Sequence, residues 1–349
     1  MVLSTANPLR VGTDFSGLEA PTLALRMMGV PIEHCFACDN LRAAQRISEH
    51  YFAPAVFYPD IRQRNNAETP QVHLYVSGYP CRDYSRLGRM RGIAGRTGEL
   101  ALYSVDYIQQ SRPQLALFEN VVPHTADARR LFAFLRDRVR GLGYHADWHS
   151  LNTANYGLPQ SRRRMWLVCV RQDVSARRFR VPRPSGVRIN LFALVTPLPP
   201  HLWRDLPPDS DQRARDHVLH AYEKYAGDGV NMFETPVVVD TEGSRKFKAF
   251  ALDSSPCLTR GHSAARSYWC STKGGPLTVH EMASLQGITR DMLDPVADLG
   301  ITERQYGAMI GDTMSVNVVC YIISGMLYAG GFSAKRESRG FLRTSGWGL

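Results

Sequence analysis

Residues 10–40 read RVGTDFSGLEAPTLALRMMGVPIEHCFACDN, and this stretch indicates how the chain folds. Residues 10–15 form a short β-rich run, residues 20–28 carry apolar side chains at helical spacing up to Gly29, and residues 34–38 form a second β-rich run. A strand, a helix and a second strand in this order are typical of a βαβ unit on a parallel sheet.

The same alternation continues to residue 171. A helical stretch over 41–51 is followed by strands over 72–77 and 114–118, with a helix over 100–110 between them. A helix over 126–140 then precedes two β-rich runs, 145–151 and 164–171. The pattern predicts an α/β fold with a doubly wound, mostly parallel, Rossmann-like sheet and a hairpin appended to it.

The composition changes after residue 171, and this change indicates a second domain. Residues 172–210 are rich in Pro and Arg, a helix is expected over 211–225, and short strands are expected over 237–240 and 247–251. Helical periodicity resumes at 277, and 305–327 has the pattern of one apolar terminal segment. We predict a main domain formed by 1–180 and 291–335, a smaller domain over 181–290 and a tail over 336–349.

Composition and charge limit the function classes. With 349 residues, of which 44% are hydrophobic and 21% charged, the chain can bury a core, which excludes a disordered protein. We expect an intracellular protein without a membrane segment, because no apolar run reaches about 20 residues and no basic flank leads into an apolar start. The net charge of +10, carried mostly by Arg, favours a nucleic-acid partner, although a GC-rich genome explains the Arg excess equally well.

Acidic side chains follow successive predicted strands. The loop Asp14-Phe15-Ser16-Gly17-Leu18 follows the first strand, where doubly wound sheets bind nucleotides, although it contains only one glycine. Asp39 ends the second strand and can accept the hydroxyls of a ribose, and Asp60, further on, can accept from an adenine amino group. The two acids suggest an adenosine pocket that need not hold a diphosphate.

A second group of motifs carries reactive chemistry. Cys81 follows a strand end and Pro80 in a glycine-rich basic loop, which makes it a nucleophile candidate, and the adjacent Arg82 would favour its thiolate. Glu119 follows the next strand, so we expect it at the same sheet edge as Cys81. Arg162 and Arg164 are two residues apart and share one face of a strand. A metal site at the Cys-x-x-C of residues 35–38 is not expected, because strand geometry turns the two thiols to opposite faces.

Together these motifs resemble the cytosine-5 DNA methyltransferases from about residue 10 to 325. The matching segments, in the family's order, are DFSGL (14–18), ACDN (37–40), PDI (59–61), GYPCRDYS (78–85), FENV (118–121), QSRRR (160–164), GPLTVHEMASLQG (275–287) and IGDTMSVN (310–317). The resemblance implies a methyl transfer from S-adenosylmethionine to carbon 5 of a cytosine that is flipped out of double-stranded DNA.

The resemblance also implies a role for each matching residue. Cys81 would attack carbon 6, Glu119 would hold and protonate the ring, Arg164 would contact the 2-keto oxygen, and Arg162 would steady Glu119 or a phosphate. The implied cofactor-binding residues are Phe15, Ser16, Gly17, Leu18, Asp39, Asn40, Asp60, Ile61, Pro80, Leu100, Asp312 and Thr313. Those implied to bind DNA are Arg82, Ser85, Arg89, Arg91 and Arg96, and residues 185–255 would read the target bases.

The chain departs from the family pattern at several positions. Glu19 and Ala20 replace a Gly-Gly pair, Arg82 replaces Gln, Thr97 alters an Asp-x-Arg-Gly, and Asp312 replaces Asn. None of these departures removes a bond-making group. Two alternatives stay open, a transfer-RNA methyltransferase of the same family and a non-catalytic DNA-binding paralogue. We expect a monomer with no obligate protein partner, located in the cytoplasm of a bacterial or viral system or in a eukaryotic nucleus.

Overall fold

The structure is a computed structural model that describes residues 3–80, 99–174, 177–181, 183, 186–244, 248–262, 267–293 and 296–334. The described residues divide into two compact units. The first takes those within 3–151, 163–183 and 316–334, and the second those within 152–162 and 186–315. The second unit thus extends beyond residue 290, the end predicted for the smaller domain, because the helices that follow pack with those before them.

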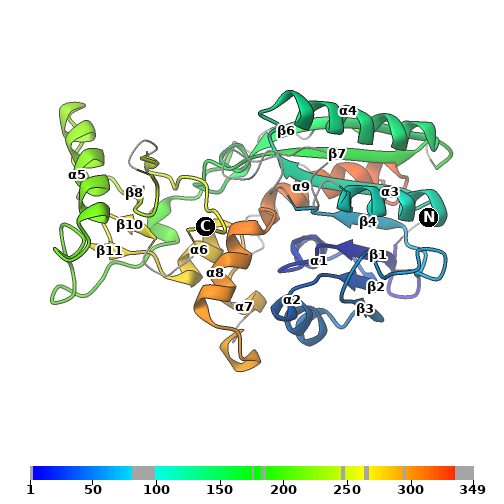
Figure 1. Ribbon diagram of the computed structural model, residues 1–349, viewed down its shortest axis with the longest axis horizontal. Coiled ribbons are helices and arrows are strands. Elements are labelled where there is room, and N and C mark those ends of the chain that lie inside the picture. Colours follow the sequence, from blue (N-terminus) through cyan, green and yellow to red (C-terminus); the bar gives the residue numbers. More distant parts are fainter. Residues whose placement is uncertain are drawn as a thin grey trace. The chain divides into compact units, whose positions relative to one another are not determined.

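The first unit contains a seven-stranded sheet in the order β3-β2-β1-β4-β5-β7-β6 (Figure 1). Its strands are β1 (Leu9–Asp14), β2 (Ile32–Cys38), β3 (Val56–Tyr58), β4 (Leu74–Ser77), β5 (Leu115–Val121), β6 (Tyr144–Asn152) and β7 (Arg163–Arg171). The first five strands pair in parallel, whereas β7 runs antiparallel to β5. The predicted doubly wound, mostly parallel fold is confirmed, and the two runs predicted as a hairpin are β6 and β7.

Helices pack against this sheet within the first unit. They are α1 (Ala20–Met27), α2 (Arg42–Ile47) with the π-helical turn η1 (Ser48–Phe52), α3 (Leu100–Ser111), α4 (Ala126–Gly141) and α9 (Val316–Ala329). Helix α1 packs against α9, and α3 packs against α4. Val105 of α3 and Leu131 of α4 join Tyr75 and Phe118 of the sheet in one buried cluster. Within α3 and within α4, the buried side chains recur at helical spacing, and this apolar periodicity is the pattern that predicted both helices.

The apolar segment predicted over 305–327 is two helices, α8 (Glu303–Asp312) and α9. Thr313 is extended, with φ −66° and ψ 153°, and it ends α8. The Ser315 hydroxyl donates to Gln286 Oε1 at 2.7 Å, which holds the residues that follow the break. Among the described residues, no single helix is long and apolar enough to cross a membrane.

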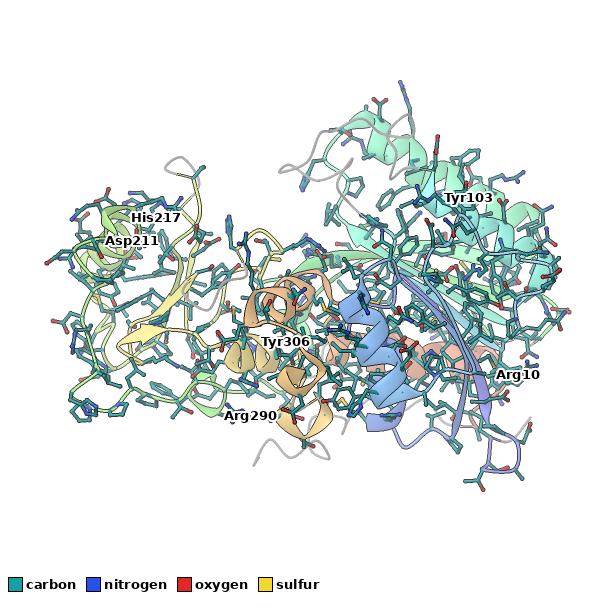
Figure 2. All side chains as sticks on the ribbon, turned by 60° about the horizontal axis from the view of Figure 1, so that its bottom comes forward. Arg10, Tyr103, Asp211, His217, Arg290 and Tyr306 are labelled. Carbon is teal, nitrogen blue, oxygen red and sulfur yellow. The ribbon has the colours of Figure 1, made fainter. Side chains whose placement is uncertain are left out.

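The second unit contains a four-stranded antiparallel sheet in the order β11-β10-β8-β9. Its strands are β8 (Val237–Asp240), β9 (Phe250–Leu252), β10 (Tyr268–Cys270) and β11 (Gly275–Pro276), and its helices are η3 (Thr153–Tyr156), η4 (Leu191–Ala193), α5 (Gln212–Gly227), α6 (Val279–Leu285), α7 (Arg290–Leu293), η5 (Val296–Leu299) and α8. Asp211 is the N-cap residue of α5, and its side chain accepts from Ala214 N. His217, which Figure 2 labels on the same helix, is buried, and its Nδ1 lies 3.0 Å from the Asp240 carbonyl oxygen. The short strands β10 and β11 were not predicted, because two or three residues carry too little periodicity to indicate a strand.

Candidate active site

The loop after β1 has an unusual backbone. Phe15, Gly17 and Glu19 all adopt left-handed conformations, with φ of 55°, 51° and 56°. For a residue with a side chain, this conformation costs roughly 1–2 kcal/mol. The Glu19 amide donates to the Ser16 carbonyl at 2.7 Å and closes the turn around Gly17. Strained backbone of this kind persists where the surroundings hold it, and it is frequent at ligand sites.

Asp39, which follows β2, lies beside this loop. Its two carboxylate oxygens accept from Gly17 N at 3.0 Å and from Leu41 N at 2.8 Å. The side chain is therefore held in place, and a carboxylate has further lone pairs to offer a ligand hydroxyl. Asn40, the next residue, is exposed.

Asp60 follows β3, the neighbour of β2, and this places it at the same sheet edge as Asp39. Its carboxylate is not isolated, because the Arg62 guanidinium donates to both oxygens at 2.6–3.1 Å. This hydrogen bond lowers the pKa of Asp60 below its usual value. Ile61 beside it is buried. The pairing of Arg62 with Asp60 was not predicted. The chain contains so many arginines that a single one gives no signal of its partner.

A buried ion pair anchors the segment that carries Asp60. Arg64 makes a two-pronged contact with Asp14 at the end of β1, both side chains are fully buried, and the Tyr75 hydroxyl also donates to Asp14. The rings of Phe36, Tyr58 and Tyr107 lie 5.1–5.6 Å from the guanidinium carbon. Burial by itself lowers the pKa of Arg64, but the Asp14 carboxylate outweighs it and raises that pKa. The guanidinium is therefore charged, and it ties the loop after β3 to β1.

Glu119 and Arg164 meet across the antiparallel pair of β5 and β7. Glu119 lies opposite Trp166 and Val121 lies opposite Arg164, so the two charged residues are diagonal neighbours on one face. Arg164 Nε lies 3.2 Å from Glu119 Oε1, and their side chains are 15% and 8% exposed. A carboxylate and a guanidinium are thus held together, nearly out of water, at the carboxyl end of β5.

Asn120 connects this pair to the loop that follows β4. Its side-chain amide donates to the Tyr79 carbonyl at 3.0 Å, and its own oxygen accepts from Val121 N at 2.8 Å. Asn120 is 1% exposed, so this hydrogen bond is shielded from water. Tyr79 lies two residues before Cys81, and the bond therefore holds the backbone that leads to it. The sequence contains Asn120 within the FENV motif but gives no signal of this contact.

The residues of the predicted catalytic loop lie outside the described part of the chain. They are Cys81, Arg82, Ser85, Arg89, Arg91 and Arg96. Pro80, which precedes them, is partly buried, and Leu100 is the first residue of α3.

Arg162 has a structural environment that the sequence did not indicate. It precedes β7, belongs to the second unit and is 2% exposed. Its guanidinium donates to the carbonyls of Leu258 at 2.8 Å, Gly311 at 3.1 Å and Thr313 at 2.8 Å. The Arg162 side chain thus links the backbone at Leu258 to the end of α8. Its predicted contact with Glu119 or a phosphate stays a prediction.

Asp312 and Thr313 lie at the end of α8 in the second unit. Asp312 forms an ion pair with Arg260, and Thr313 is buried. Packing requires a glycine at position 311, because a Cβ there would lie 2.4 Å from the backbone of Thr259 and Arg260. The predicted contribution of Asp312 and Thr313 to the cofactor pocket also stays a prediction.

One observation tests whether the loop after β1 fits a cofactor. Ser16 is 8% exposed, and its hydroxyl oxygen is buried without a hydrogen-bond partner among the residues that the structure describes. Buried polar groups are nearly always paired, so this hydroxyl suits a site that a polar ligand completes. Leu18, the fourth residue after β1, is fully buried. No group of three or more potential metal-ligating side chains comes together in the described ranges.

Comparison with known families gives one match over most of the chain. Residues 15–327 match the family described as C-5 cytosine-specific DNA methylase. Among curated proteins, the chain is 27% identical over 184 residues to the type II methyltransferase M.HhaI of Haemophilus parahaemolyticus, covering 52% of this chain and 55% of that protein. It is 27% identical over 194 residues to M.MthTI of Methanothermobacter thermautotrophicus, covering 54% and 57%. The matched segments span about half the length of these relatives.

Solved structures show the same fold. The S. pombe Dnmt2 methyltransferase superposes with a TM-score of 0.65 at 18% identity, over 91% of this chain and 98% of that one. The Entamoeba histolytica methyltransferase EhMeth gives a TM-score of 0.63 at 12% identity, over 92% and 98%.

Proposed function

Because the chain belongs to the family of C-5 cytosine-specific DNA methylases, we propose that it methylates carbon 5 of cytosine in double-stranded DNA. The target base would be flipped out of the duplex, since a stacked base exposes neither face to an attacking group. The net charge of +10 supports a polyanionic substrate. A DNA substrate implies an intracellular site of action.

The residues of the β1 loop and its neighbours would hold S-adenosylmethionine. The cofactor supplies an electrophilic methyl group on a sulfonium. Asp39 would accept hydrogen bonds from the ribose hydroxyls, and Asp60 would accept one from the adenine amine. The Ser16 hydroxyl would form its hydrogen bond with the cofactor. Phe15, Gly17, Leu18, Asn40, Ile61, Pro80, Leu100, Asp312 and Thr313 complete the proposed set.

The Glu119–Arg164 pair is the observation that carries this proposal. Protonated Glu119 would donate to ring nitrogen 3 of cytosine and accept from the exocyclic amine, and Arg164 would donate to the 2-keto oxygen. The edge of cytosine presents these groups side by side, so a carboxyl group and a guanidinium 3.2 Å apart are complementary to it. Both side chains are nearly buried, where hydrogen bonds to developing charge are strongest.

Cys81 would form the covalent bond. Its thiolate would add to carbon 6, while the proton from Glu119 neutralises ring nitrogen 3 and carbon 5 becomes nucleophilic. After methylation of carbon 5, a water molecule would accept the carbon-5 proton, the thiolate would leave carbon 6, and the proton on ring nitrogen 3 would return to the Glu119 carboxylate, which restores the neutral ring. Asn120 would keep the backbone before Cys81 in register with Glu119. Arg82, Ser85, Arg89, Arg91 and Arg96 would grip the DNA, and residues 185–255 would read its sequence.

Expression of the chain in a host without cytosine methylation tests the proposal. Bisulfite sequencing of the host DNA should show 5-methylcytosine in a defined sequence context, and a Cys81→Ala variant expressed at the same level should leave none. Equal methylation by the variant would contradict the covalent mechanism. Purified protein that methylates transfer RNA but not duplex DNA would contradict the substrate.

A further inference from the structure

Glu19 is the residue at which the β1 loop turns into α1. It has φ 56° and ψ 39°, a conformation that suits glycine, and it is the N-terminal cap residue of the helix, although its side chain does not cap it. Its amide closes the turn around Gly17 through the Ser16 carbonyl. Gly17 in turn donates to Asp39. The backbone conformation at residue 19 therefore sets the shape of the loop that faces Asp39.

The Glu19 side chain is fully buried and heavily hydrogen-bonded. The Thr13 hydroxyl lies 3.0 and 3.2 Å from its two oxygens, the Thr22 hydroxyl donates to Oε2 at 3.0 Å, and the Ser48 hydroxyl donates to Oε1 at 3.0 Å. His34 Nε2 lies 3.7 Å from Oε1. These partners come from β1, α1, η1 and β2, so one carboxylate is bonded to or lies beside four elements of the first unit.

A buried carboxylate and a left-handed backbone at one residue are each unfavourable alone. Together they have a simple explanation. A side chain that is held from several directions keeps its backbone in the left-handed conformation, which an unrestrained residue would abandon. The strain is then maintained at the loop whose Ser16 hydroxyl still lacks a partner among the described residues.

We propose that Glu19 is a positioning residue, whose anchored carboxylate keeps residue 19 left-handed and so holds the loop over residues 15–19 in the shape that receives S-adenosylmethionine. The proposal rests on the function proposed above. It assigns Glu19 no contact with the cofactor, and its effect passes through the backbone turn at Ser16 and Gly17.

Two substitutions separate this role from ordinary packing. Glu19→Ala and Glu19→Gly lose the same carboxylate, but glycine accepts a positive φ without strain and alanine does not. Calorimetric titration with S-adenosylhomocysteine, well below the unfolding temperature, should give a Kd raised roughly 5- to 30-fold for the alanine variant, because its loop spends less time in the binding conformation. The glycine variant should stay within about threefold of the wild type, although it removes more of the side chain.

A packing role alone predicts the opposite order, with glycine the weaker binder. A glycine variant that binds as weakly as the alanine variant, or an alanine variant that binds like the wild type, would overturn the inference. A wild-type protein that binds no S-adenosylhomocysteine would overturn the proposed function, and this inference with it.

Thr22→Val provides a test that does not need the alanine variant to fold. It removes one hydroxyl donor to Glu19 at nearly constant volume. It should weaken S-adenosylhomocysteine binding several-fold in the wild type and leave it unchanged in the Glu19→Gly background, where no carboxylate remains to be held. Equal weakening in both backgrounds would contradict the mechanism.

Discussion

Asn120→Ala should slow methyl transfer with little effect on cofactor binding. The amide is the side-chain donor that reaches from β5 to the Tyr79 carbonyl, at 3.0 Å and 1% exposure. Its loss frees the backbone two residues before Cys81, while Asp39 and the β1 loop keep their contacts. The catalytic step should therefore respond more strongly than the binding step.

The size of this effect follows from the burial of the bond. A buried carbonyl that loses its donor costs about 1–3 kcal/mol. If the activation free energy for attack of Cys81 on the base rises by that amount, kcat should fall roughly 5- to 150-fold. Asn120→Asp should be at least as slow, because it keeps the acceptor for Val121 N but places an oxygen against the Tyr79 carbonyl.

Single-turnover methyl transfer to duplex DNA, with S-adenosylhomocysteine binding measured in parallel, separates the two steps. Tyr144→Phe is a matched control, because its hydroxyl also donates to a buried backbone carbonyl, that of Pro113 at 2.6 Å, at the opposite end of β5. The control should unfold at a slightly lower temperature and retain its rate. An Asn120→Ala protein that is folded and transfers methyl groups within twofold of the wild type would refute the reasoning.

Three further changes test other parts of the structure. Arg64→Met should destabilise the first unit by about 3–5 kcal/mol and lower its unfolding temperature by roughly 6–20 °C, because it leaves Asp14 buried without its cation; adding Asp14→Asn should recover part of the loss in thermal unfolding. Arg162→Lys should lower the unfolding temperature measured by calorimetry, since one ammonium cannot match a planar fork that donates to three carbonyls. The hydrogen bond to Asp240 raises the pKa of His262, so its stabilising contribution is complete below the unfolded-state pKa of about 6.5 and is lost as pH rises through the folded-state value. The unfolding temperature of wild type should accordingly exceed that of His262→Gln by more at about pH 5.5 than at about pH 8.5, and an equal difference at both would contradict the assignment.

Much of the fold was predictable because its signals are local. Strands β1, β2, β5 and β7 and helices α1, α3 and α4 lie within a few residues of their predicted limits, since each carries its own periodicity. The break between α8 and α9 was missed because apolar spacing continues across it, while the extended Thr313 and the Ser315 contact that make it depend on residues far away in sequence.

The same distinction applies to the site. The predicted strand limits were enough to place Asp39 at the end of β2 and Glu119 near the carboxyl end of β5, and parallel strands present these ends at one edge. Which charged groups bind each other was decided by the tertiary structure. Arg64 meets Asp14 across 50 residues, Arg162 reaches carbonyls 96 to 151 residues away, and Glu19 collects hydroxyls from β1, α1 and η1. Arginines and hydroxyl side chains are common along this chain, and only their burial and proximity in the folded protein make particular ones partners.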